Sequence, residues 1–223
     1  MNLLLAAVTP VFIIIVYIYL KDKYEKESKR ILFTSFLFGA VVSVILTSFL
    51  YILFDLFVPM TNEYSVIQQF IRAFFVVALT EEFSKYVIVR YFSQPRDDFN
   101  EPFDGIIHAV MVSMGFAAVE NILYVIEGGM TTAILRAFTA VPAHATFAIM
   151  MGYFMGKAKF SDQRFKWNLA GLGLAILFHG AYDFFLFINF IPGISIGAFV
   201  SLIIGIILSR KAIKAHQEGS FFK

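Results

Sequence analysis

Long hydrophobic runs, separated by short polar segments, recur along the whole chain. A helix that spans a membrane needs about 20 mostly apolar residues. Seven runs meet or approach that length, and Pro59, Gly128-Gly129 and Pro192-Gly193 interrupt the chain between some of them. The runs cover residues 3–20, 31–57, 67–92, 105–126, 131–155, 168–188 and 194–209. The pattern predicts an all-α fold: a polytopic membrane bundle of about seven helices that forms a single domain over residues 1–223.

The composition agrees with a location in the cell membrane. Of the 223 residues, 59% are hydrophobic and only 15% are charged, against about 25% charged in a typical soluble domain. Too few polar residues remain to cover a soluble surface. The first run lacks the preceding basic residues and the following small-residue cleavage site of a signal peptide, so we expect a retained helix. The absence of cysteine excludes disulfides and thiolate metal sites.

The basic residues predict the orientation of the bundle. Fifteen of the 18 lysines and arginines lie on alternate connections, within residues 21–30, 90–104 and 156–167 and in the C-terminal tail. Cytoplasmic loops carry an excess of these residues. We therefore expect the N-terminus outside and the C-terminus in the cytoplasm, with the basic clusters contacting lipid headgroups rather than nucleic acid. The exceptions are Arg72, Lys85 and Arg136.

Several ionisable or polar residues fall inside the hydrophobic runs. A charge at mid-membrane costs roughly 2.5–3.5 kcal/mol, so such residues usually face the bundle interior and are functional candidates. Helical rise places them roughly 10–20 Å below the outer boundary, and we therefore expect them to converge on one layer in the outer half of the membrane. They are Glu81, Glu82 and Lys85 in the third run, Glu120 and Asn121 in the fourth, His144 in the fifth, and His179 and Asp183 in the sixth.

Structural interpretations compete with this one. Glu81 and Lys85 lie one turn apart and could form an ion pair, which would leave Glu82 unexplained. His108, near the start of the fourth run, is expected to be structural and paired with Asp104, which would cap that helix. Hydrogen bonding or packing alone could also explain His144, the His179 and Asp183 pair, and Glu120 with Asn121.

Paired carboxylates with histidines suit the activation of water. In a low dielectric one carboxylate stays protonated while the other acts as a general base, and a histidine can donate a hydrogen bond to an oxyanion. This set predicts peptide hydrolysis without a covalent intermediate. Ser84 and Ser113 lie nearby but in no nucleophile motif.

A metal-dependent route remains an alternative. His144, His179 and a carboxylate could form a zinc site with an open position. The sequence contains no H-E-x-x-H motif, and the two histidines are on different helices. We therefore expect no cofactor, with zinc as the alternative.

Four motifs, in order, resemble the PrsW family. They are EEFSK at 81–85, GFAAVEN at 115–121, PAHATFAIMMGY at 142–153 and FHGAYDF at 178–184. The likeness covers about residues 1–190 and includes FDGI at 103–106. PrsW proteins are membrane-embedded proteases of Gram-positive bacteria, related to the CAAX-processing and bacteriocin-immunity membrane proteases.

The resemblance implies both a substrate and a set of site residues. The expected activity is site-1 cleavage of a membrane-spanning anti-sigma factor on its extracytoplasmic side, after which a second intramembrane protease releases the sigma factor. The CAAX relatives have a histidine at the position of Glu120, so their geometry does not carry over whole. The catalytic residues implied are Glu81, Glu82, Glu120, His144 and His179, with Lys85, Asn121 and Asp183 in support.

Two other classes of function compete with a protease. A proton- or ion-coupled transporter could use the carboxylates as relay groups, although no internal repeat of the kind common in transporters is visible. A non-catalytic membrane scaffold would tolerate the loss of Glu81 or Glu82. For a protease, the expected partners are a single-pass membrane protein and the lipid bilayer, with no nucleic acid.

Overall fold

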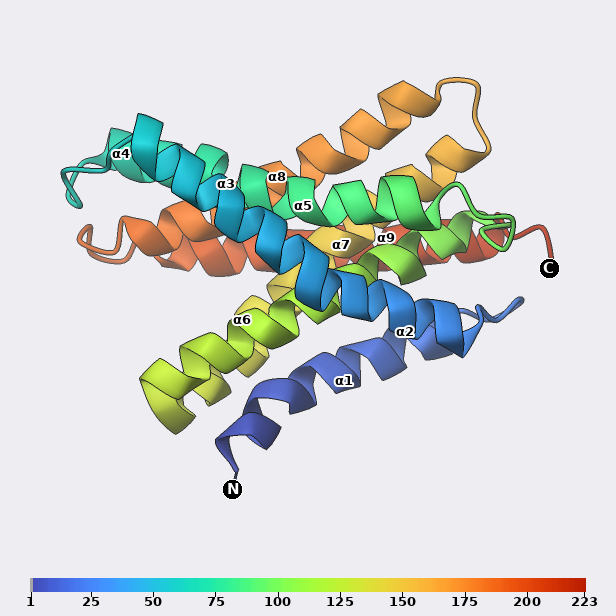
Figure 1. Cartoon of the computed structure of the whole chain (residues 1–223), viewed down its shortest axis with the longest axis horizontal. Helices are drawn as coiled ribbons and strands as arrows, with labels where there is room; N and C mark the ends of the chain where they lie inside the picture. The colour runs from blue at the N-terminus through green and yellow to red at the C-terminus, as the bar shows by residue number, and fades with distance from the viewer. Residues whose placement is uncertain (1) are drawn as a thin grey trace.

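The computed structural model describes residues 2–223, which fold into a bundle of long helices and contain no β-strand (Figure 1). The all-α prediction is therefore confirmed. Helix α1 (Leu3–Lys21) is followed by two continuous helical rods that contain π-helical stretches. The first rod comprises α2 (Lys29–Phe38), η1 (Gly39–Ser43) and α3 (Val44–Phe57), and the second comprises α4 (Val66–Ile71), η2 (Arg72–Ala78), α5 (Leu79–Ile88) and η3 (Val89–Ser93). The remaining helices are α6 (Pro102–Phe138), α7 (Ala140–Lys159), α8 (Arg164–Phe187) and α9 (Ile196–Glu218).

Helix α6 reverses direction near its end. Gly129 has φ 69° and ψ −158°, a conformation that glycine reaches without steric cost. The break predicted at Gly128-Gly129 is therefore confirmed. The returning chain breaks again at Thr139, with φ −124° and ψ −79°, before α7 begins. The single helix predicted over 131–155 is thus wrong, because two helices meet there shortly before His144.

The chain is a multi-pass membrane protein. Five helical stretches are long and apolar enough to cross a membrane, and one of them, the 58-residue stretch Pro102–Lys159, folds back on itself at Gly129. The rod over residues 66–93 is too rich in charge to be counted with them. Six of the seven predicted runs nevertheless each correspond to one helical segment, and the run at 131–155 is divided at Thr139. The number of crossings and the orientation stay predictions.

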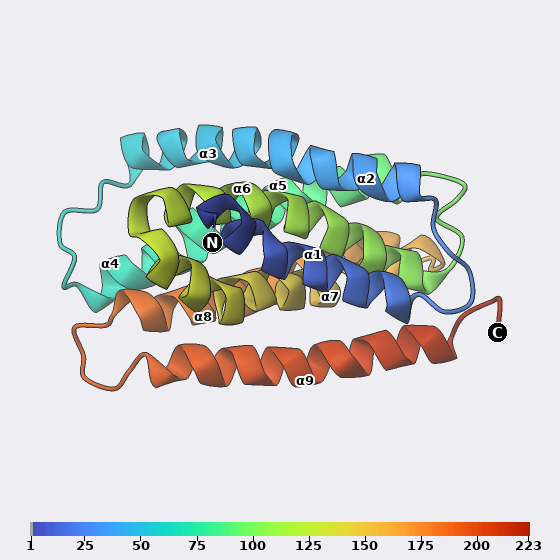
Figure 2. The ribbon, with the colours of Figure 1, turned by 90° about the horizontal axis from the view of Figure 1, so that it is seen from below.

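The basic connections lie together at one end of the bundle, which we call the basic end. This is the right-hand end in Figures 1 and 2. It contains the loops at 22–28, 94–101 and 160–163 and the C-terminus, whereas the loops at 58–65 and 188–195 lie at the opposite end. This arrangement agrees with the alternation of charge along the sequence.

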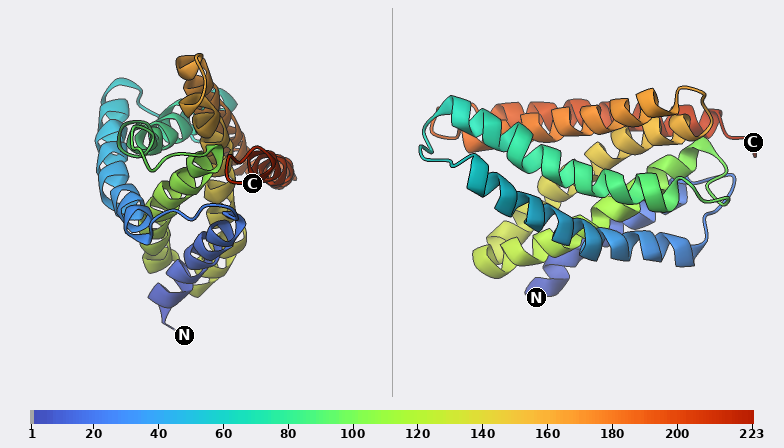
Figure 3. Two further views of the ribbon diagram at one scale, coloured as in Figure 1. Left: turned by 90° about the vertical axis from the view of Figure 1, so that its right-hand side faces the viewer. Right: turned by 45° about the horizontal axis from the view of Figure 1, so that its top comes forward.

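Helices α6 and α7 form the centre of the bundle, with α1, α2, α8 and α9 packed around them (Figure 3). Glycines allow close approach: a Cβ on Gly105 would lie 2.3 Å from the carbonyl oxygen of Gly152, and one on Gly115 would lie 2.0 Å from that of Phe36. Small residues let membrane helices pack in this way. Large apolar side chains point outward, as lipid-facing surfaces require, and the polar residues are enclosed between helices.

Candidate active site

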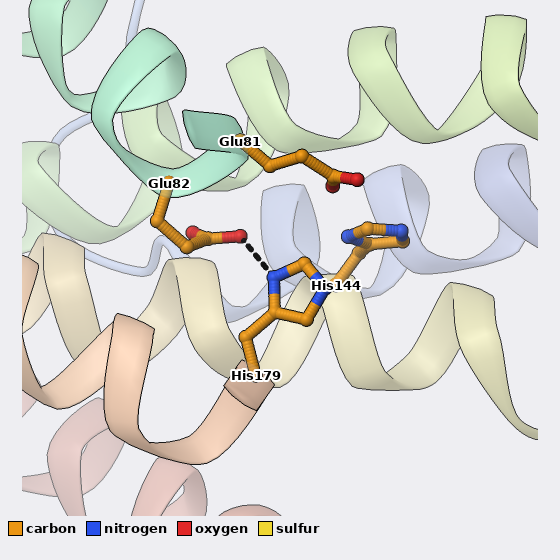
Figure 4. Close-up of side chains that lie close together, drawn as sticks. All are labelled: Glu81, Glu82, His144 and His179. Atoms are coloured by element: carbon orange, nitrogen blue, oxygen red, sulfur yellow. Dashed lines mark hydrogen bonds and ion pairs between the residues drawn. The ribbon is translucent and has the colours of Figure 1, made fainter. Parts of the chain in front are cut away.

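All eight polar residues predicted for the site lie in one interior network. The four at its centre are Glu81 and Glu82 on α5, His144 on α7 and His179 on α8 (Figure 4). One carboxylate or imidazole atom from each of these four lies within 4.8 Å of those from the others. The expected convergence of distant segments therefore occurs, while the catalytic roles of these residues stay predictions.

The sequence spacing on α5 sets the first half of this cluster. Lys85 is one turn from both glutamates, and its Nζ lies 2.8 Å from Glu82 Oε1 and 3.3 Å from Glu81 Oε2. Ser84 fastens this helix to the first rod, since its hydroxyl lies 2.8 Å from that of Ser43 and 2.7 Å from that of Thr47. The helix therefore cannot turn its polar face away from the interior without losing these bonds.

The two glutamates have different surroundings. Glu81 accepts a hydrogen bond of 2.8 Å from the hydroxyl of Tyr51 and lines a cavity. Glu82 is fully buried behind it. Its Oε1 is 2.9 Å from His179 Nδ1, whereas its Oε2 has no hydrogen-bond partner within residues 2–223. Glu81 therefore faces the cavity, whereas Glu82 lies enclosed within the cluster.

Lys85 occupies the middle of the cluster. Besides the two carboxylates, its Nζ lies 3.3 Å from His144 Nδ1 and 4.3 Å from the centre of the Phe116 ring. An ammonium has no acceptor capacity, so the Nδ1 facing it accepts this hydrogen bond. Lys85 is thus a fixed positive charge among three of the four central groups.

Each central histidine is supported by a carboxylate. His144 Nε2 lies 2.8 Å from Glu120 Oε2, and His179 Nε2 lies 3.3 Å from Asp183 Oδ2. In both rings Nδ1 therefore faces the cluster while Nε2 faces away. Phe147 stacks on His179 with ring centres 4.9 Å apart, which fixes the plane of that ring.

Arg136 belongs to the network although the sequence reasoning assigned it no role. Its guanidinium group donates a hydrogen bond of 2.7 Å to Glu120 Oε2 and one of 2.6 Å to Asn121 Oδ1. The side-chain amide of Asn121 in turn donates a hydrogen bond of 2.6 Å to the carbonyl of Ala7 on α1. Glu120 Oε2 thus contacts Arg136 and His144 together. The sequence does contain a signal for Arg136, because it is one of the three basic residues that lie outside the basic loops and tail.

A cavity of about 590 Å³ opens beside the cluster. Glu81, His144 and His179 line it together with residues from α3, η2, α6 and α8. Its outer wall includes Asp55, two residues before the end of α3, and Phe187, the last residue of α8. Both helices end there at the end opposite to the basic end (Figure 2).

Other candidates from the sequence lie elsewhere. The hydroxyl of Ser113 donates to the carbonyl of His144 at 3.1 Å, so it is used structurally. The pairing of His108 with Asp104 is wrong: His108 lies 3.0 Å from Ser35 Oγ and 3.4 Å from Glu27 Oε1. Asp104 does cap α6, since its carboxylate accepts the backbone N–H of Glu101 at 2.8 Å. His108 is fully buried and outside the central cluster, as a structural residue would be.

The central residues fit a divalent metal. Two imidazoles with a carboxylate form a common donor set of catalytic zinc, and Nδ1 of both histidines faces the cluster. A metal-bound histidine usually donates its other N–H to a carboxylate or carbonyl, which is the relation of His144 to Glu120 and of His179 to Asp183. The unpartnered, buried Oε2 of Glu82 is a further available donor.

Comparison with known proteins identifies the family. A model of the PrsW family intramembrane metalloproteases matches residues 27–209. The chain is 39% identical to Protease PrsW of Geobacillus kaustophilus over 83% of this chain and 80% of that protein. It is 35% identical to Protease PrsW of Bacillus subtilis over 81% of each chain, and 35% identical to that of Clostridioides difficile over 85% of this chain and 81% of the relative. No solved structure matches it. The chain therefore belongs to the PrsW family of intramembrane proteases, and it is a peptidase.

Proposed function

We propose that this peptidase cleaves a single-pass membrane protein, an anti-sigma factor, on the extracytoplasmic side of the membrane, with Glu81 activating the attacking water. The observation that carries the proposal is the joint exposure of Glu81, His144 and His179 to one cavity inside the bundle. The resemblance of the sequence motifs to the PrsW family implies the class of substrate.

The position of the cavity supports the side of cleavage. Its outer wall is formed where α3 and α8 end, away from the basic loops. Basic loops mark the cytoplasmic side. A substrate helix that enters the cavity from that end therefore reaches Glu81 from the extracytoplasmic side.

The reaction uses groups that already touch the cavity. Glu81 removes a proton from water as the water oxygen bonds to the carbonyl carbon of the peptide. When substrate is bound, an N–H of His144 or His179 leaves the carboxylate that it now contacts and donates to the carbonyl oxygen, where it stabilises the developing negative charge. The same proton then passes from Glu81 to the peptide nitrogen, and the C–N bond breaks to give a carboxylic acid and an amine. The acid passes its proton to the amine, so the products are a carboxylate and an ammonium group.

The remaining residues hold these groups in place. Lys85 and Glu82 fix the position of Glu81 and of His179 through the bonds described above. Glu120 keeps Nε2 of His144 bonded, and Arg136 fixes Glu120. Positioned general bases and oxyanion donors contribute about 10²–10⁴-fold each to rate.

The four donors are compatible with a metal if the Lys85 ammonium withdraws from them. Glu81, Glu82, His144 and His179 would hold it, and when bound it would supply a Lewis acid and a more acidic water. The prediction that no metal is required stays a prediction. It rests on the lack of a compact ligand motif in the sequence, whereas the fold brings four possible ligands together from three helices.

The test is cleavage of a single-span anti-sigma substrate by purified protein in liposomes, with and without a chelator. Glu81→Gln is nearly isosteric and should lower the rate by 10²-fold or more. Glu82→Gln should also reduce it strongly. Glu127→Gln is the matched control, because Glu127 is exposed near the turn at Gly129 and lies outside the cavity lining.

Two outcomes would overturn the proposal. If Glu81→Gln and Glu82→Gln both cleave at the wild-type rate, the paired glutamates form only a structural ion pair. If the wild type cleaves unrelated single-span proteins but leaves the anti-sigma substrate intact, the substrate assignment is wrong. Loss of activity in the chelator, restored by zinc with stoichiometric metal, would overturn the prediction of a metal-free reaction alone.

A further inference from the structure

A second hollow, of about 360 Å³, lies at the basic end between the last turns of α1 and α9. It is far from the candidate active site in the fold and shares no residue with that cavity. Three of its six lining residues are cationic and none is acidic. The lining residues are Tyr17, Lys21, Arg210, Ile213, Lys214 and Gln217.

The positive charge of this hollow is largely unneutralised. Within residues 2–223, no carboxylate lies within 4.0 Å of the charged groups of Lys21 or Arg210. Lys214 pairs only with Glu218, at 3.6 Å, and both side chains are more than half exposed, so this pair contributes little.

Other cations at the same end are used by the protein. Arg96 pairs with Asp98 at 3.0 Å. The Lys159 ammonium donates hydrogen bonds of 2.8 Å and 2.9 Å to the backbone carbonyls of Gln94 and Arg96. By contrast, the side chains of Lys21 and Arg210 form no such hydrogen bonds within the described chain, and with Lys214 they converge on one concave site.

The surroundings of the hollow match the boundary between headgroups and acyl chains. Helices α1 and α9 both pack on α7 and are joined at this end by a hydrogen bond from the Gln217 amide to the Lys21 carbonyl. Figure 3 (left) looks onto this end of the bundle. Tyr17, one turn before Lys21, is exposed, and the Lys21 ammonium lies 5.3 Å from its ring centre. Toward the membrane centre the outward faces become apolar, as with Ile13 on α1 and Ile207 on α9.

We propose that this hollow binds the phosphate headgroup of an anionic phospholipid. Arginine matches phosphate oxygens with paired N–H donors, and lysines add point charges. Basic pockets between membrane helices on the cytoplasmic side are suited to such headgroups. A zwitterionic lipid carries its own ammonium, which these three cations repel. The acyl chains of a bound lipid would lie against the apolar faces of α1 and α9.

The test compares lipid binding to delipidated protein in detergent. Phosphatidylglycerol is titrated and followed by native mass spectrometry, with phosphatidylcholine and inorganic phosphate as separate arms. Each cation near an anionic surface contributes about fivefold in affinity, so a variant with Lys21, Arg210 and Lys214 all changed to glutamine should bind roughly 100-fold more weakly. The matched control changes the exposed Lys23, Lys29 and Lys166, at the same end of the bundle, to glutamine.

The proposal is supported if phosphatidylglycerol binds with one-to-one stoichiometry, if the control variant retains that affinity, and if the hollow variant loses it at an unchanged melting temperature. Binding should also weaken with added salt. Equal affinity in the two variants would overturn it, as would equal binding of phosphatidylcholine. Saturation by inorganic phosphate without preference for the lipid would show a site for a free anion and would refute the lipid assignment. If the hollow variant fails to fold, Arg210→Gln alone should still weaken binding about fivefold.

Discussion

Replacement of Lys85 with methionine tests the electrostatic balance of the candidate active site. Lys85 is 1% exposed, and its ammonium lies within 3.3 Å of both paired carboxylates. Methionine keeps a long apolar side chain and removes the charge. Glu81 and Glu82 would then remain side by side without the cation that lies between them and His144.

The loss of stability should be large. Removal of one partner from a buried ion pair costs about 3–5 kcal/mol. For a chain of 150–250 residues each kcal/mol lowers the melting temperature by about 2–4 °C, so a decrease of roughly 6–20 °C is expected. An exposed lysine should show no such effect, and Lys211 on α9 provides that control.

The same geometry predicts competition between lysine and metal. The ammonium touches Glu81, Glu82 and His144, which are three of the four donors that a divalent ion would use. A divalent ion about 4 Å from an ammonium is repelled by roughly 2 kcal/mol even in a water-like dielectric, which is more than tenfold in affinity. Lys85→Met should therefore bind zinc more than tenfold tighter than wild type and regain most of its melting temperature when zinc is added.

The assay is thermal unfolding of the wild type, Lys85→Met and Lys211→Met in detergent, first in a chelator and then in zinc. Zinc affinity is measured by competition with a coloured chelator. A melting temperature for Lys85→Met within about 2 °C of wild type in the chelator would refute the role of the ammonium as a neutralising cation. Equal zinc affinity in the two proteins would refute the competition.

Three further predictions concern other parts of the chain. Arg136→Gln should lower the rate of cleavage about 10–100-fold, because it removes the hydrogen bond that positions Glu120. Arg136→Lys should restore part of that rate. Both variants are compared with wild type by kcat and KM, and an unchanged kcat in Arg136→Gln would exclude a positioning role. Burial raises the pKa of Asp22 to about 6 from 3.8, so ionisation of Asp22 destabilises the fold increasingly as pH rises from about 4 to about 6, and fully above that. Asp22→Asn should therefore raise the melting temperature at pH 8, and this gain should vanish as pH falls toward about 4; a gain that does not depend on pH would contradict the cause. For topology, a single cysteine at position 62 should react with an impermeant thiol reagent in intact cells and one at position 162 should not, and the reverse pattern would invert the bundle.

Local sequence pattern predicts most of the helices and eight members of the interior network. Hydrophobic runs predict seven helical segments because membrane helices must satisfy their backbone within one segment. Charges within those runs predict an interior cluster because lipid does not accommodate them. Glu81, Glu82 and Lys85 were further constrained by their spacing on one helix.

Contacts between distant segments were beyond that pattern. His108 pairs with Glu27, which is 81 positions away, and Arg136 reaches back to Glu120 across the turn at Gly129. Such contacts depend on how closely the helices approach and on how the rods are rotated. The break at Thr139 does have a local signal, because threonine is common at helix N-caps and Pro142 lies in the first turn of α7, but the continuous hydrophobic run hides it.

The charge of the site explains why either a metal or additional protons are chemically reasonable there. With neutral histidines, its four carboxylates and two cations leave a net charge of −2, which a buried cluster in a low dielectric does not hold without compensation. Two additional protons would neutralise it, and so would one divalent ion. The protonated arrangement agrees with Lys85 at the centre, whereas a metal requires the ammonium to withdraw. Lys85 therefore distinguishes the two states, which is why its replacement should alter metal affinity as well as stability. The carboxylates are Glu81, Glu82, Glu120 and Asp183, and the cations are Lys85 and Arg136.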